Sequence, residues 1–114
     1  PTAAHELARC LLVAAAAMAE DRKAGGLYHL AGAGETSWAG FAEAIFSRAE
    51  PYWHRCPVLH RITTEEYPTP ARRPANSRLD CRQFEADFAT RPEHWEMSLD
   101  TVIAALREAE PDLF

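Results

Sequence analysis

The residues of this chain best suited to bind an anion lie in YPTPARRPANSRLD, which runs from Tyr67 to Asp80. Between Ala71 and Arg82 four arginines stand against one aspartate, a local charge of +3 in a chain whose formal net charge is -5. Guanidinium groups present planar forks that match phosphate oxygens, and the prolines limit the conformations of the unbound loop. The segment predicts a rigid, cationic, phosphate-binding loop, and residues 67–80 are called the arginine loop below. The alternative is a solvated loop whose arginines pair with acidic residues.

A second motif, GAGETS from Gly32 to Ser37, lies between an expected strand and an expected helix. That placement is typical of a dinucleotide-binding loop, but Ser37 stands where the third glycine of G-x-G-x-x-G would be. Its side chain would crowd the close approach of helix and strand, and no acidic residue follows at the expected place. A tight turn in which Ser37 caps the helix is the better interpretation.

Metal and nucleophile chemistry find little support. His54, Cys56 and His60 are three metal-type ligands, but a structural zinc needs four and usually pairs its cysteines two apart. We therefore expect no metal site. Cys10, Cys56 and Cys81 are an odd count at wide spacings, which favours a reducing compartment over a disulfide framework, and each is most simply a core residue.

Lys23 is the only lysine, and Ala19 stands four residues before it. The chain therefore has no Tyr-x-x-x-Lys pair, and it has no complete glycine fingerprint. No Ser-His-acid or Cys-His set can be assigned from spacing alone. We expect no catalytic and no cofactor-binding residue in this chain.

Length and composition indicate what kind of protein carries the arginine loop. The 114 residues suit one domain, and 47% hydrophobic with 25% charged residues is ordinary for a soluble globular protein. No apolar run reaches the roughly 18 residues of a membrane span. The acidic net charge opposes general nucleic-acid binding. Because Pro1 is followed at once by a helix cap, we expect a piece cut from a longer protein.

The first half of the chain predicts two amphipathic helices. Thr2 is a plausible N-cap for the first, which ends before Gly25-Gly26, and Ser37 caps the second, which stops at Pro51. The first helix has an apolar stripe of Leu7, Leu11, Leu12, Ala15 and Met18. The second has an inner face of Trp38, Phe41, Ala42, Ile45 and Ala49.

Two short segments have the composition of strands, Leu27–Ala31 and Val58–Thr64. Strand, helix and strand in this order predict a parallel pair with a right-handed crossover. Toward the end, Asp80 is the expected N-cap of a third helix, with Gln83 three residues later and Leu79 stapled onto Phe84. Pro92 should lie in the first turn of a last helix, whose apolar face is Trp95, Leu99, Val102, Ile103 and Leu106.

The elements together indicate a helix-rich α/β fold of about four helices and a small, mostly parallel two-stranded sheet. In that fold, GLYHLAGAGETSWAGFAEAIF and ITTEEYPTPARRPANSRLD resemble the C-terminal half of the dTDP-4-dehydrorhamnose reductases, which are extended short-chain dehydrogenase/reductases. The resemblance covers nearly the whole chain, and the arginine loop is its most specific part. Residues 1–114 would then be one substrate domain that binds a nucleotide-sugar, with the Rossmann half that binds the cofactor missing from this chain.

The resemblance implies a function for the parent enzyme, the reduction of dTDP-4-dehydro-L-rhamnose to dTDP-L-rhamnose with NADPH or NADH in the cytoplasm. It implies that the loop faces the dTDP-sugar through Arg73, Asn76, Ser77 and Arg78. The piece alone would be inactive. Its partner would be its own N-terminal Rossmann half, and the surface left exposed could drive self-association.

Two other interpretations stay open. Some relatives of these reductases are non-catalytic regulatory subunits that bind a partner enzyme, and their loop resembles this one. A structural module without a ligand is the third. An intact Tyr-x-x-x-Lys in the complete gene would favour the reductase.

Overall fold

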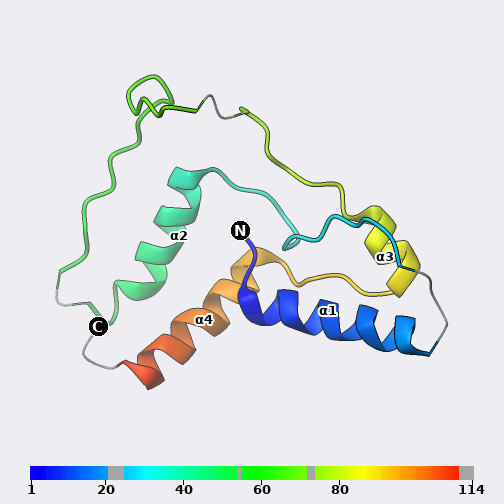
Figure 1. The fold of residues 1–114 in the computed structure, drawn as a ribbon. Coiled ribbons are helices and arrows are strands. Elements are labelled where there is room, and N and C mark those ends of the chain that lie inside the picture. The colour runs from blue at the N-terminus through cyan, green and yellow to red at the C-terminus, as the bar shows by residue number, and fades with distance from the viewer. Residues whose placement is uncertain (21–24, 54, 72–73, 111–114) are drawn as a thin grey trace.

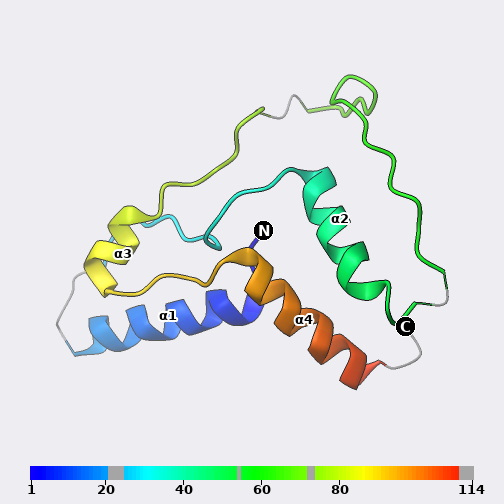
Figure 2. The ribbon, with the colours of Figure 1, turned by 180° about the vertical axis from the view of Figure 1, so that it is seen from behind.

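The computed structural model describes residues 1–20, 25–53, 55–71 and 74–110, and these contain four helices. They are α1 (Ala4–Ala19), α2 (Trp38–Ala49), α3 (Arg82–Phe88) and α4 (Trp95–Ala109). Helix α1 packs with α3, and α2 packs with α4 (Figures 1 and 2). Among the described residues, no helix has the length and apolar character needed to cross a membrane. The four expected helices are confirmed.

The two-stranded sheet was a wrong prediction, because the described residues form no strand. Leu27–Ala31 runs beside α1 and α3, whereas Val58–Thr64 lies in the long exposed loop on the far side of α2 (Figure 1). A strand needs a neighbouring backbone for its hydrogen bonds, and neither segment has the other within reach. The one parallel bridge in the described part is isolated and joins Ala33 to His94.

Helix α1 buries a different face from the one expected. Its buried residues are Glu6, Cys10, Ala14 and Ala17. Cys10, Ala14 and Ala17 pack with Phe84 and Phe88 of α3, while Leu7, Leu11 and Leu12 of the predicted stripe are 36%, 53% and 72% exposed. The reason is visible in the sequence, since all residues from Cys10 to Ala19 are apolar and so mark no single face.

The start of α1 is tied to the segment that precedes α4. The Glu6 carboxylate accepts hydrogen bonds from Arg9 Nε at 3.0 Å, from Arg9 Nη2 at 2.8 Å and from the Glu93 backbone N–H at 2.8 Å. Thr2 does not cap the helix, contrary to prediction; Ala3 holds that position, and the Thr2 hydroxyl accepts from Gly32 N–H at 2.9 Å. The Thr2 hydroxyl is thus used in a contact with a distant part of the chain instead of capping α1.

The second core lies between α2 and α4. Trp95, Leu99 and Ile103 are buried there, and the partly buried Phe41, Ala44 and Ile45 pack against them. The predicted cap is confirmed, because Ser37 Oγ accepts from Gly40 N–H at 3.0 Å. The predicted inner position of Trp38 is wrong, since that side chain is 82% exposed at the first turn of α2.

The starts of the last two helices differ slightly from the predictions. Cys81, not Asp80, occupies the N-cap position of α3, although the Asp80 carboxylate accepts from Arg82 N–H at 3.1 Å. Helix α4 begins at Trp95 with His94 as its N-cap, so Pro92 precedes it. Differences of one or two residues at a helix end are ordinary.

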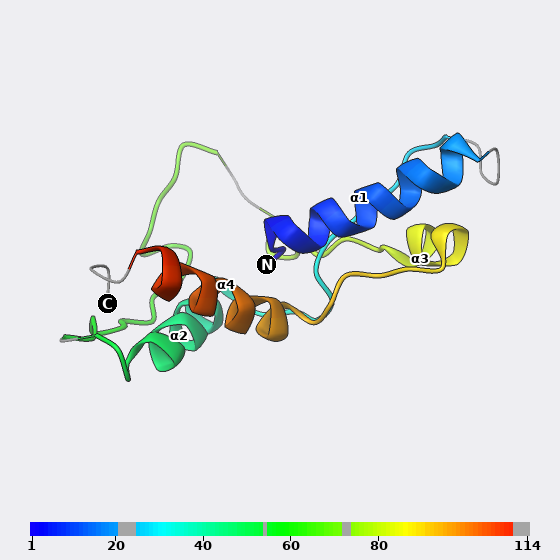
Figure 3. The ribbon, with the colours of Figure 1, turned by 90° about the horizontal axis from the view of Figure 1, so that it is seen from below.

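The two helix pairs lie end to end and make an open, flat molecule (Figure 3). Its extents are 52 × 38 × 21 Å and its radius of gyration is 17.5 Å, against about 13 Å for a compact domain of this length. Two small cores, rather than one, hold the described residues.

Candidate functional site

The described residues of the arginine loop, 67–71 and 74–80, are exposed and irregular, and the second of these stretches leads into α3 (Figure 1). Asn76, Ser77 and Arg78 are described and exposed. Arg72 and Arg73 lie outside the described residues, so the predicted role of Arg73 stays a prediction. Residues 74–80 are therefore the described part of the loop next to α3.

Asn76 holds Arg78 by two hydrogen bonds. Its Oδ1 accepts from the Arg78 backbone N–H at 3.0 Å and from the Arg78 Nε–H at 2.9 Å. One amide oxygen thus fixes both the local turn and the direction of the guanidinium group. Asn76 thus contacts Arg78 in the structure, whereas the resemblance implied only that it faces the dTDP-sugar.

The guanidinium of Arg78 meets an acidic partner far away in the sequence. Its Nη1 donates to Glu35 Oε2, a carboxylate of the GAGETS turn, and both side chains are more than half exposed. The turn itself is well defined, because Gly34 has φ +84, a left-handed conformation that favours glycine. The expected tight turn capped by Ser37 is confirmed.

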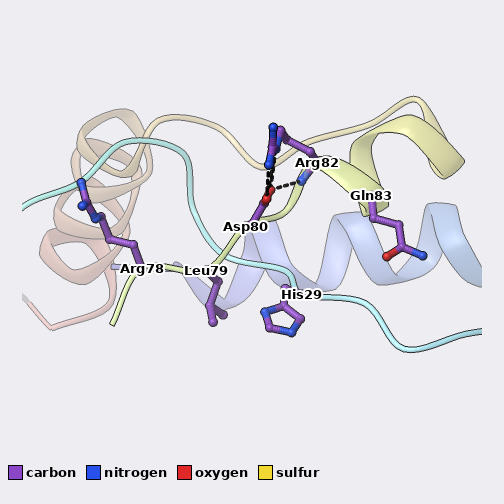
Figure 4. Close-up of a pocket in the computed structure, with 6 residues that line it drawn as sticks. All are labelled: His29, Arg78, Leu79, Asp80, Arg82 and Gln83. Atoms are coloured by element: carbon purple, nitrogen blue, oxygen red, sulfur yellow. Dashed lines mark hydrogen bonds and ion pairs between the residues drawn. The ribbon is translucent and has the colours of Figure 1, made fainter. Parts of the chain in front are cut away.

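Close to Arg78 the surface forms a hollow of about 630 Å³ (Figure 4). Its lining is His29, Arg78, Leu79, Asp80, Arg82 and Gln83. In the close-up, Arg78 points away from Arg82 and Gln83, so the two guanidinium groups do not converge. Of the three predicted site residues that the structure describes, Asn76, Ser77 and Arg78, only Arg78 is among the lining residues.

The second arginine of the hollow is already paired. Arg82 Nε lies 2.9 Å from Asp80 Oδ1, and Arg82 Nη2 lies 2.5 Å from Asp80 Oδ2. The Arg82 side chain, and then its backbone N–H, lower the pKa of Asp80 to about 2, and the carboxylate raises the pKa of Arg82. Among the described residues, the charges of Arg78 and Arg82 are therefore matched by Glu35 and Asp80.

Sequence reasoning missed Glu35 and His29 as parts of this site. Glu35 was assigned to a turn, and nothing in the spacing of 43 residues indicates that it meets Arg78. His29 had a usable signal, because it alternates with Tyr28 and Leu30, which pack against the first core while His29 is exposed. The described residues hold no cluster of three or more metal-type ligands, and His54 lies outside them.

Comparison with known proteins gives a consistent result. Residues 1–108 match the family described as RmlD substrate binding domain. A dTDP-4-dehydrorhamnose reductase of Sinorhizobium fredii is 42% identical over 108 residues, and one of Escherichia coli is 34% identical over 108 residues. Each match covers 93% of this chain but only 36% of the relative. The spore coat polysaccharide biosynthesis protein SpsK of Bacillus subtilis is 36% identical over 74 residues, which is 65% of this chain and 24% of that protein.

Proposed function

The chain belongs to the RmlD substrate-binding domain family, and from this premise we propose that it is the substrate-binding part of a dTDP-4-dehydrorhamnose reductase. The complete enzyme would be a cytoplasmic oxidoreductase that reduces dTDP-4-dehydro-L-rhamnose to dTDP-L-rhamnose with NADPH or NADH. Identity of 32–42% over 93% of the chain to several reductases supports this proposal. The chain spans about a third of their length, so the rest of the enzyme lies outside it.

The nicotinamide cofactor does not fit the residues present. The best candidate is the GAGETS turn, where Ser37 Oγ already accepts from Gly40 N–H, a donor at the start of α2 that a phosphate would need. The turn also packs on the beginning of α4 through the bridge between Ala33 and His94. Binding of NADPH or NADH is therefore assigned to the part of the enzyme outside this chain.

The role proposed for the arginine loop is to bind the diphosphate of the dTDP-sugar. Arg78 and Arg73 would neutralise its charge, Asn76 would hold Arg78, and Ser77 would add a neutral donor. The single observation that carries this role is the pair of hydrogen bonds from Arg78 to Asn76 Oδ1, because it pre-orients a guanidinium beside the hollow. Orientation matters because hydride transfer needs the ketone carbon close to the nicotinamide, so binding energy at the diphosphate can raise the rate at the ketone.

Titration of dTDP into the complete gene product tests the loop. A charge-assisted hydrogen bond contributes roughly 1.5–3 kcal/mol, so Arg78→Ala should weaken dTDP binding and lower kcat/KM by about 10- to 100-fold. Arg61→Ala is the matched control, because Arg61 is exposed and paired with Glu43. Unchanged dTDP affinity and unchanged turnover in both Arg78→Ala and Arg73→Ala would refute the proposed binding of the diphosphate by the arginine loop. Reductase activity of the unaltered product separates the enzyme from a non-catalytic subunit.

We also propose that the outer face of α1 packs against the remaining part of the enzyme. The helix is apolar on all sides from Cys10 to Ala19, yet only one side meets α3. Leu11 and Leu12 are more than half exposed, and helices that are apolar all round are normally covered on all sides. The open shape and the two small cores agree with a missing neighbour.

A charge placed on this face tests the contact. Leu12→Glu should lower the thermal stability of the complete gene product and reduce self-association of the 114-residue chain in sedimentation. Val58→Glu is the control, because Val58 is similarly exposed but lies in the irregular segment that follows α2. If Leu12→Glu and Val58→Glu behave alike in both experiments, α1 is not the contact.

A further inference from the structure

We propose that Glu35 is a built-in competitor for the anion at Arg78. Its carboxylate accepts a hydrogen bond from the Arg78 guanidinium, and a phosphate must displace it to bind. This inference rests on the proposed function of the arginine loop. It adds a residue outside that loop, 43 positions earlier in the chain, that sets how tightly the substrate is held.

The position of Glu35 is determined by the fold rather than by the loop it contacts. Ala33 N–H donates to Glu93 O at 3.0 Å, and Trp95 N–H donates to Ala33 O at 3.0 Å, so the turn is fastened to the start of α4. At Gly34, which precedes Glu35, an added Cβ would lie 2.2 Å from His94 Nε2. The backbone that carries Glu35 thus has a fixed neighbour on one side and a defined left-handed bend before it.

Arg78 is likewise oriented before any ligand arrives. Asn76 Oδ1 accepts from its Nε–H, and Glu35 accepts from its Nη1. A phosphate that binds the terminal fork of Arg78, formed by Nη1 and Nη2, would use the Nη1 group that Glu35 holds, while the Nε–H stays with Asn76. The carboxylate must therefore leave, or remain close to a like-charged diphosphate, and either outcome lowers the affinity for the anion.

The expected effect is modest, because both partners face solvent. The side chains of Arg78 and Glu35 are 62% and 64% exposed, and ion pairs at such sites change an equilibrium constant by about fivefold at most. Glu35→Gln keeps the size and a hydrogen-bonding oxygen but removes the charge. We expect it to raise the affinity for dTDP by about two- to fivefold, with a smaller gain at high salt because salt screens exposed charges.

Calorimetric titration of dTDP into the complete gene product provides the test, with Glu35→Gln, Arg78→Ala and the double variant compared at low and high salt. Glu43→Gln is the matched control, since Glu43 is an exposed carboxylate paired with Arg61 away from the hollow. The inference predicts a gain in Glu35→Gln, no change in Glu43→Gln, and no gain from Glu35→Gln once Arg78 is alanine.

The outcomes separate the inference from the proposal beneath it. If Arg78→Ala weakens binding but Glu35→Gln leaves it unchanged, the competition is refuted and the arginine role survives. If Glu35→Gln weakens binding, Glu35 contacts the ligand instead of opposing it, and the inference is also refuted. If Arg78→Ala has no effect, the proposed role of Arg78 fails, and the competition fails with it.

Discussion

Glu6 should contribute a measurable share of the stability of the chain, and Glu6→Gln tests this. The carboxylate is nearly buried, at 5% exposure, and receives two hydrogen bonds from Arg9 and one from the Glu93 backbone. Arg9 chiefly, and then the Glu93 N–H, lower the pKa of Glu6 from 4.5 to about 2, while burial acts in the opposite direction. Through its bond with the Glu93 N–H, Glu6 joins α1 to the residues just before α4.

The size of the effect follows from the pKa. A fall from 4.5 to about 2 corresponds to about 3 kcal/mol in favour of the charged form, at about 1.4 kcal/mol per pH unit. The Arg9 side chain is 45% exposed, so solvent screens part of the attraction. We expect Glu6→Gln to lower the free energy of unfolding by about 2 kcal/mol at pH 7.

The pH dependence has a definite sign. Because the pKa of Glu6 is lower in the folded chain, its stabilisation is complete above pH 4.5 and is lost progressively as the pH falls from there through about 2. Urea denaturation of the 114-residue chain should give a free energy of unfolding that is lower for Glu6→Gln than for wild type at pH 7. This difference should be smaller at pH 3. Glu108→Gln is the control, an exposed glutamate of α4 with no such partner among the described residues.

Two results of the denaturation experiment would contradict the predicted contribution of Glu6. One is a free energy of unfolding for Glu6→Gln that equals that of Glu108→Gln at pH 7. The other is a difference from wild type that stays the same at pH 3, since a charge-independent cause would then account for it. A carboxyl pKa near 4.5 for Glu6, measured by NMR, would also refute the proposed network.

Two further predictions concern local packing. Gly34→Ala should lower the free energy of unfolding by about 2 kcal/mol, because φ is +84 and the new methyl group would meet the His94 ring. Gly25→Ala should be neutral, because no described residue lies within 4 Å of the added Cβ. Equal melting temperatures for the two variants would contradict this. Burial raises the pKa of the Cys10 thiol, so DTNB should modify Cys56 and Cys81 at least about tenfold faster than Cys10; equal rates would show that the first core opens readily.

Local sequence signals were enough to predict most of the helices. Ser37 provides its side-chain oxygen within a few residues of the N–H it caps, so that contact needs no tertiary structure. The apolar spacing of Trp95, Leu99 and Ile103 predicted the buried face of α4, because mainly polar residues separate these positions. In α1 the same method failed, since a continuous apolar run is compatible with any buried face.

In the candidate site too, features of neighbouring residues were predictable from the sequence, and contacts between distant residues were not. The amino-acid sequence alone predicted an arginine-rich, proline-spaced loop before α3 and a turn at GAGETS, because both depend on residues next to one another. Helix packing was needed to establish that Glu35 pairs with Arg78 and that the Glu6 carboxylate accepts from the Glu93 N–H. It also established that, among the described residues, no strand pairs with Leu27–Ala31. Contacts between distant positions depend on how helices pack, and spacing along the chain does not encode which residues that packing brings together.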